Sequence, residues 1–146
     1  MLALSLALAA CGGDDEKPYD PASDNHGLGY QFDAQGPRGL KLRFAPRFTA
    51  GDRLANPATY EQAFDELQTC SGLSAPVPPF VIIQPSGTLP DVNGLYYSEP
   101  PLIRIDEPGA FRHEALHYLF EVNTGDPDSS GTHADQAFTR CTSGTP

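Results

Sequence analysis

The sequence is short of basic residues, and this shortage limits the partners that the protein can have. Lys and Arg together number 9 among 146 residues, against 19 Asp and Glu, so the formal net charge at pH 7 is −10. A chain with this balance has no electrostatic means of holding nucleic acid or of adsorbing to anionic lipid. We therefore expect no nucleic-acid partner and no membrane binding through charge.

The chain opens with an apolar run, residues 1–10, which is too short to span a bilayer. Its end, Leu8-Ala9-Ala10-Cys11, resembles the lipobox of bacterial lipoprotein signals, although no Lys or Arg precedes the run. The resemblance implies a signal peptide that is removed and a lipid anchor on Cys11. Gly12 rather than Asp follows Cys11, and by the same resemblance we expect an exported protein at the bacterial cell envelope, with the outer membrane favoured.

Residues 11–36 hold few apolar side chains and are rich in Gly, Asp, Pro and Ser. This composition predicts a disordered acidic tether, in which His26 is solvated. The remaining residues, 37–146, are expected to fold as one domain and to remain monomeric. They contain no repeat and no appended recognition module that would select a substrate.

Cysteine is scarce, since beyond Cys11 the chain has only Cys70 and Cys141. An even pair in an exported chain favours a disulfide over two separate thiols, because the compartment is oxidising. The bridge would attach the C-terminal tail to an earlier helix.

The first part of the folded domain predicts a strand and then a helix. Apolar and basic residues alternate over residues 40–44, which is typical of a half-buried strand. Asn56 and Pro57 then provide a capping residue and a first helical position. The helix presents one apolar stripe and ends near Cys70.

Three further strands are predicted. The run Phe80-Val81-Ile82-Ile83-Gln84 indicates a central strand that is buried on both faces. Residues 95–97 and 102–105 are two short strands with Pro100 and Pro101 between them. These prolines argue against a close hairpin and place one of the two strands at a sheet edge.

Histidine is scarce as well, and three of the four histidines lie between positions 113 and 133. His113, Glu114 and His117 form the pattern H-E-x-x-H within an apolar, helix-compatible run. Positions i and i+4 share one helix face, so both imidazoles can hold one zinc ion (Zn2+) with Glu114 beside it. There Glu114 can act as general base towards a water that zinc has acidified. The bare pattern also arises by chance, in helices whose histidines bind nothing.

The context of the motif favours a metal. The run predicts a helix that starts at Asp106-Glu107-Pro108 and ends at Gly125. Apart from Arg112 and the motif residues, this helix is apolar on nearly all sides, which predicts burial in the middle of the fold. Buried imidazoles and carboxylates are costly without partners, and a metal would provide one.

A hydrolytic zinc usually takes three protein ligands and keeps its fourth position for water. His133 is the best candidate for the third ligand, because it follows a turn-rich loop from which the chain can fold back over the metal. Asp126 and Asp128, in that loop, are the alternatives.

The order of strand, helix, strands, H-E-x-x-H helix and ligand-bearing tail resembles that of the zincins, a superfamily of zinc metallopeptidases, over about residues 38–141. The resemblance implies a minimal zincin-like α+β fold, with a small twisted mixed sheet, a backing helix and a buried active-site helix. It implies zinc ligation by His113 and His117, catalysis by Glu114, and a short edge strand along which a peptide or protein substrate pairs. The metzincin spacing and the second, glutamate-bearing helix of the gluzincins are absent, so the resemblance leaves the third ligand open.

Two questions stay open at this point. The oxyanion stabiliser of such a site could be Tyr96, Tyr97 or Tyr118, although tyrosines more often serve in the core or at its rim. The function could also be that of a non-catalytic lipoprotein in which zinc staples a small domain, and four protein ligands would then close the site. A surface module without any metal is the third possibility.

Overall fold

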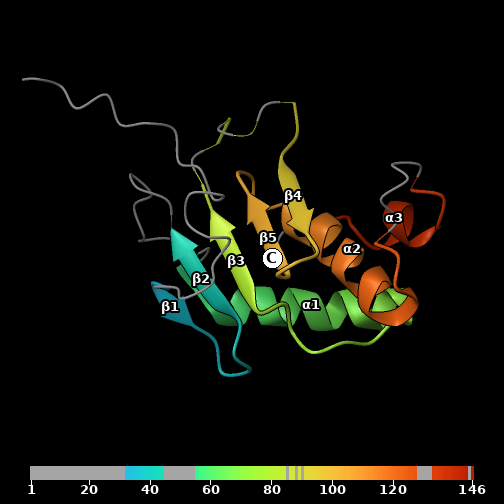
Figure 1. The fold of residues 1–146 in the computed structure, drawn as a ribbon, viewed down its shortest axis with the longest axis horizontal. Coiled ribbons are helices and arrows are strands. Elements are labelled where there is room, and N and C mark those ends of the chain that lie inside the picture. Colours follow the sequence, from blue (N-terminus) through green and yellow to red (C-terminus); the bar gives the residue numbers. More distant parts are fainter. Residues whose placement is uncertain are drawn as a thin grey trace, which may run out of the picture.

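A computed structural model of the chain describes residues 32–44, 55–84, 86, 87, 89, 91–127, 133–144 and 146. Over these residues the chain forms a mixed five-stranded sheet and three helices (Figure 1), which confirms the expected α+β class. The expected signal peptide, the lipidated Cys11 and most of the expected tether lie outside the described residues.

The strands are β1 (Ala34–Gln35), β2 (Lys41–Phe44), β3 (Phe80–Ile83), β4 (Gly94–Tyr97) and β5 (Leu102–Ile105). Their order in the sheet is β1-β2-β3-β5-β4. The three central strands are parallel, and β1 and β4 lie antiparallel at the two edges. β1 pairs with β2, so regular structure begins slightly before the boundary at residue 37 that composition suggests.

β4 and β5 form a close hairpin, and the expectation against one is wrong. Tyr97 pairs with Leu102, so residues 98–101 make the whole connection. Pro100 and Pro101 lie within this connection and not in either strand, and they therefore remove no hydrogen bond from the ladder. β4 is an edge strand, as was predicted for one of the two.

Helix α1 (Pro57–Ser71) begins and ends where the sequence predicts. The Asn56 side chain accepts a hydrogen bond from the Ala58 N–H at 3.1 Å, which satisfies one free donor of the first turn. Gly72 ends the helix in the left-handed conformation, with φ of 74°.

Helix α2 (Ala110–Thr124) carries the H-E-x-x-H motif and begins later than predicted. Its N-cap is Gly109, with no side-chain hydrogen bond to the first turn. The expected cap, Asp106, is buried and accepts the Leu89 N–H at 3.0 Å instead. A contact with a residue far away in the chain has therefore taken the carboxylate that the local pattern assigned to the helix.

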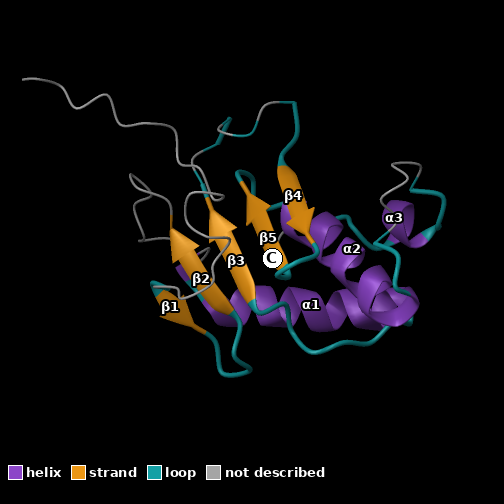
Figure 2. Ribbon diagram, in the orientation of Figure 1, coloured by secondary structure: helices purple, strands orange, loops and turns teal. Residues whose placement is uncertain are grey.

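Figure 2 shows both long helices on the same side of the sheet. Val81 and Ile83 of β3 pack in the core with these helices, whereas Phe80 and Ile82 pack on the other face with Leu102. All four residues of β3 are buried, which confirms the predicted central strand. Helix α2 packs against β4 and β5 of the sheet and also contacts α1.

Two further links tie the helices together. Arg112 of α2 forms an ion pair with Glu66 of α1. The expected disulfide joins Cys70, in the last turn of α1, to Cys141, directly after α3 (Ala137–Arg140). Among the described helices, none is both long enough and apolar enough to cross a membrane.

Candidate metal centre

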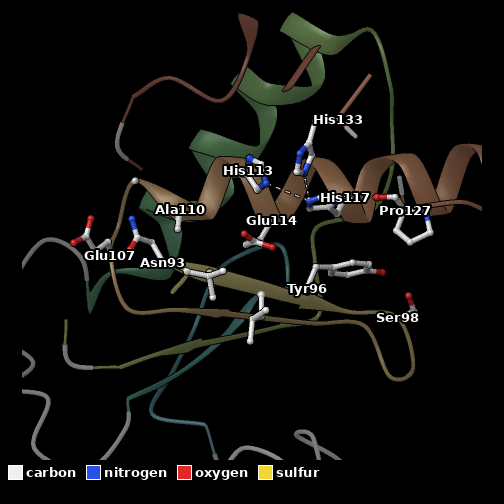
Figure 3. A pocket seen from close by; sticks show the side chains of 14 residues that line it. Asn93, Tyr96, Ser98, Glu107, Ala110, His113, Glu114, His117, Pro127 and His133 are labelled. Atoms are coloured by element: carbon white, nitrogen blue, oxygen red, sulfur yellow. Dashed lines mark hydrogen bonds between the residues drawn. The ribbon is translucent and has the colours of Figure 1, made fainter. Parts of the chain in front are cut away.

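Three imidazoles converge at one point beside α2 (Figure 3). The Nε2 atom of His117 lies 3.3 Å from that of His113 and 3.3 Å from that of His133. In a tetrahedral site with Zn–N bonds of about 2.0–2.1 Å, neighbouring nitrogens are about 3.3 Å apart. The spacing of these nitrogens therefore fits a zinc ion, although zinc binding itself stays a prediction.

The backbone of His133 adopts the left-handed conformation, with φ of 43°. Residues with a side chain rarely do so, and such outliers gather where a site needs them. Here the turn brings the His133 ring to within 4.7 Å of the His113 ring and 5.2 Å of the His117 ring, measured between centroids. Asp126 is exposed and outside this group, and Asp128 lies outside the described residues.

The chemical state of His113 and His117 suits a metal. His117 donates its Nδ1–H to the carbonyl oxygen of Pro127, which leaves the Nε2 lone pair directed at the other two rings. Burial, and then the neighbouring His117 and His133, lower the pKa of His113 from its ordinary 6.5 to about 4. The His113 ring is thus neutral at physiological pH, as a metal ligand must be.

The ring of Phe138, in α3, packs against all three histidine rings. Its ring centroid lies 5.4 Å from that of His113, 4.8 Å from that of His117 and 4.7 Å from that of His133. Phe120 stacks on the same ring at 5.4 Å, and Phe138 itself is only 6% exposed. Sequence reasoning missed Phe138, whose only signal was its place three residues before a bridged cysteine.

Glu114 points from α2 towards β4 and is only 7% exposed. Burial raises the pKa of its carboxyl from 4.5 to about 8. A Cβ atom on Gly94 of β4 would lie 2.7 Å from both Cγ and Oε1 of Glu114, so the strand approaches this closely only because a glycine is there. Gly94 is a second residue that the sequence did not reveal, although a glycine inside a strand can mark such an approach.

A cavity of about 700 Å³ opens between β4 and α2 and includes the three histidines and Glu114 in its walls. Val92, Leu95 and Tyr96 add apolar surface on the strand side. The site therefore combines convergent nitrogens, a buried carboxylate and space for a ligand.

The three candidate tyrosines take different positions. Tyr96 lines the cavity, but its hydroxyl donates to Glu121 and points away from the histidines in Figure 3. Tyr97 packs on the opposite face of the sheet, against the cluster that contains Ile82. Tyr118 is buried and packs against Phe64 and Tyr96. Tyr96 therefore does not direct its hydroxyl at the histidine cluster, and Tyr97 lies on the other face of the sheet.

No protein-family model matches the chain, and no characterised protein or solved structure is similar enough to count as a match. What this protein does is therefore inferred from its own residues.

Proposed function

We propose that this protein is a zinc-dependent metallopeptidase of the zincin type, with zinc held by His113, His117 and His133. The observation that carries the proposal is the convergence of three imidazole nitrogens beside a buried carboxylate in an open cavity. Sheet, backing helix and buried motif helix also stand in the order that such a peptidase would need.

Zinc, when bound, supplies a Lewis acid that acidifies a water and polarises the substrate carbonyl. Glu114 accepts the proton of the attacking water and then passes it to the leaving amine. Without a metal, burial holds the pKa of Glu114 near 8, and an adjacent cation would lower it towards the range of a base that works at neutral pH. The Pro127 carbonyl keeps His117 in the tautomer that ligation requires.

The substrate is proposed to be a peptide or an exposed protein segment that lies along β4. As an edge strand, β4 pairs with β5 on one side only and leaves a row of backbone groups on the other. An extended peptide can add to such an edge and reach the metal, because Gly94, Leu95 and Tyr96 of β4 line the same cavity as the histidines.

The competing function is a structural zinc site, which four protein ligands would close. Within the described part of the chain, the group that could hold a metal has three members. All three histidines line an open cavity that leaves room for water and substrate, and this supports catalysis over a closed structural site.

We also propose that the protein is exported and anchored at the cell envelope by lipid on Cys11, as a monomer. The lipobox-like residues 8–11 support this location. The Cys70–Cys141 disulfide agrees with it, because disulfides persist mainly in oxidising compartments.

The decisive experiment compares wild type with Glu114→Gln. The variant should keep stoichiometric zinc, measured by mass spectrometry, and should lose peptide hydrolysis by about 10²–10⁴-fold, the usual contribution of a general base. Glu99→Gln, at an exposed position in the hairpin connection, is the control that should behave as wild type. Hydrolysis at the wild-type rate in Glu114→Gln would refute the assignment.

A further inference from the structure

We propose that Glu107 gives this site a preference for substrates with Lys or Arg on the C-terminal side of the cleaved bond. The inference rests on the proposed function and adds a substrate class to it. Glu107 and Glu114 are the carboxylates among the described lining residues, and no Lys or Arg is among them.

The Glu107 carboxylate is available to a ligand. The residue is exposed, and within the described part of the chain it takes part in no ion pair. Its backbone is held in place, because the Glu107 carbonyl accepts the Ala110 N–H at 3.0 Å in the turn that leads into α2. A fixed backbone and a free carboxylate are what a selective contact with a cationic side chain requires.

The place of Glu107 in the cavity gives the direction. Figure 3 shows Glu107 and Asn93 at one end and Ser98 and Pro127 at the other, with Glu114 between them. Asn93 directly precedes β4 and Ser98 directly follows it, so β4 runs towards the Ser98 end. A peptide paired antiparallel to β4, the slightly more stable arrangement, runs the opposite way. Its C-terminal half therefore lies beside Glu107.

The reach of the contact is a few residues. A four-residue strand such as β4 is about 13 Å long at about 3.3 Å per residue. Glu107 lies at one end of the cavity and Glu114 between the two ends, so only part of this length separates the cleaved bond from Glu107. The cationic side chain is therefore expected one to three residues after the cleaved bond. An exposed ion pair discriminates weakly, so we expect about a threefold to fivefold effect on kcat/KM.

The net charge of −10 also attracts cationic peptides, but it does so differently. A field from the whole molecule acts on a lysine at any position and is screened by salt. A contact with Glu107 acts only on positions that reach it. Dependence on position therefore separates the local cause from the global one.

The test uses zinc-loaded wild type and quenched fluorescent peptides that differ only in Lys, Gln or Glu at single positions on either side of one cleaved bond. Lys should exceed Glu by about threefold to fivefold at one C-terminal-side position and by less on the N-terminal side. Glu107→Gln should abolish this difference, and Glu107→Lys should reverse it. Thr69→Lys, on the exposed surface of α1 outside the cavity, changes the net charge as Glu107→Gln does and should keep the preference.

The outcomes are separable. Equal preferences in Glu107→Gln and wild type, or an equal loss in Thr69→Lys, would overturn the role of Glu107. Failure to cleave any peptide would count against the proposed peptidase instead. In that case the affinity of Glu114→Gln for the Lys and Glu peptides, measured by fluorescence anisotropy, decides the preference without catalysis.

Discussion

Helices α1 and α2 are both 15 residues long and both end at a left-handed glycine, yet they differ in their N-caps and in the charged side chains that they bury. α1 has a side-chain cap and an apolar stripe, and its outer surface is polar. α1 also buries one carboxylate, that of Glu61, but the backbone N–H groups of Arg38 and Leu40 donate hydrogen bonds to it. α2 has no side-chain cap, and it buries two charged side chains, Arg112 and Glu114. Such burial costs stability, which the surrounding core offsets. The helix that departs from the local rules is the one that carries the candidate site, as is usual where function competes with stability.

The largest effect should come from removing a zinc ligand from the candidate site that α2 carries. His133→Ala should lower zinc affinity by more than about a hundredfold, because losing only the partner of a ligand already costs about 10–100-fold. Competition with a chromophoric chelator measures this. Gln62→Ala, on the exposed face of α1, should leave the affinity unchanged. If His133→Ala also leaves the affinity unchanged, His133 is not a zinc ligand.

The next effect concerns the approach of β4 to α2. Gly94→Ala places a methyl group 2.7 Å from two atoms of the buried Glu114, and we expect a loss of about 1–3 kcal/mol in the free energy of unfolding. Peptide hydrolysis should fall with it, because the Glu114 carboxylate must move, while zinc affinity should stay close to that of wild type.

The matched control for that variant is Gly109→Ala. An added Cβ at Gly109 meets nothing within 4 Å, and the backbone there already has the φ of −61° that alanine adopts. Urea unfolding should show Gly109→Ala to be as stable as wild type or slightly more stable. A neutral Gly94→Ala would mean that Glu114 is not confined by the strand.

A smaller effect should appear in the pH dependence of the metal-free protein. Folded Glu114 keeps its proton to about pH 8, against 4.5 for the free group, so rising pH favours the unfolded chain over that interval. His113 acts in the opposite sense up to pH 6.5, because its folded pKa is about 4. Of these two groups, only Glu114 still contributes to the pH dependence above pH 6.5.

Between pH 6.5 and 8, in a chelator, the free energy of unfolding should therefore fall by roughly 1–2 kcal/mol. The fall should be absent in Glu114→Gln and smaller in the zinc-loaded protein, where a cation lowers the pKa of Glu114. Urea titrations at the two pH values measure it. A metal-free protein that gains stability over this interval would contradict the buried, protonated Glu114.

The smallest effect belongs to α1. Asn56→Ala removes the hydrogen bond to the Ala58 N–H and should cost about 1 kcal/mol of stability. Zinc affinity should not change, because α1 supplies no ligand. A drop in zinc affinity in this variant would show that the stability of α1 affects zinc binding at α2.

Elements fixed by local signals could be predicted from the sequence, and elements fixed by distant contacts could not. Helix α1 and strand β3 follow from local signals, a cap and an unbroken β-branched run, and both are found as predicted. The start of α2 was misplaced because Asp106 bonds to Leu89, a partner 17 residues away that no local pattern reveals. The β4–β5 hairpin was missed because the prolines lie between the strands and not in them.

Some residues of the candidate site could likewise be predicted from the sequence, and others could not. The two motif histidines share a helix face by spacing alone, and the scarcity of histidine pointed to His133. Phe138 and Gly94 could not be predicted, because their roles depend on how close α3 and β4 come to the site. Such distances arise from packing across the fold and leave no periodic trace in the chain.

The disulfide has a consequence for the time at which the protein becomes active. Cys70 and Cys141 join α1 to the residue directly after α3, and Phe138 of α3 lies against all three histidine rings. Until those two thiols are oxidised, nothing covalent holds this backing against the rings. Under the proposed function, a newly made chain in a reducing cytoplasm would hold zinc poorly, and oxidation after export would complete the site. The cell that makes the peptidase would thereby be protected from it.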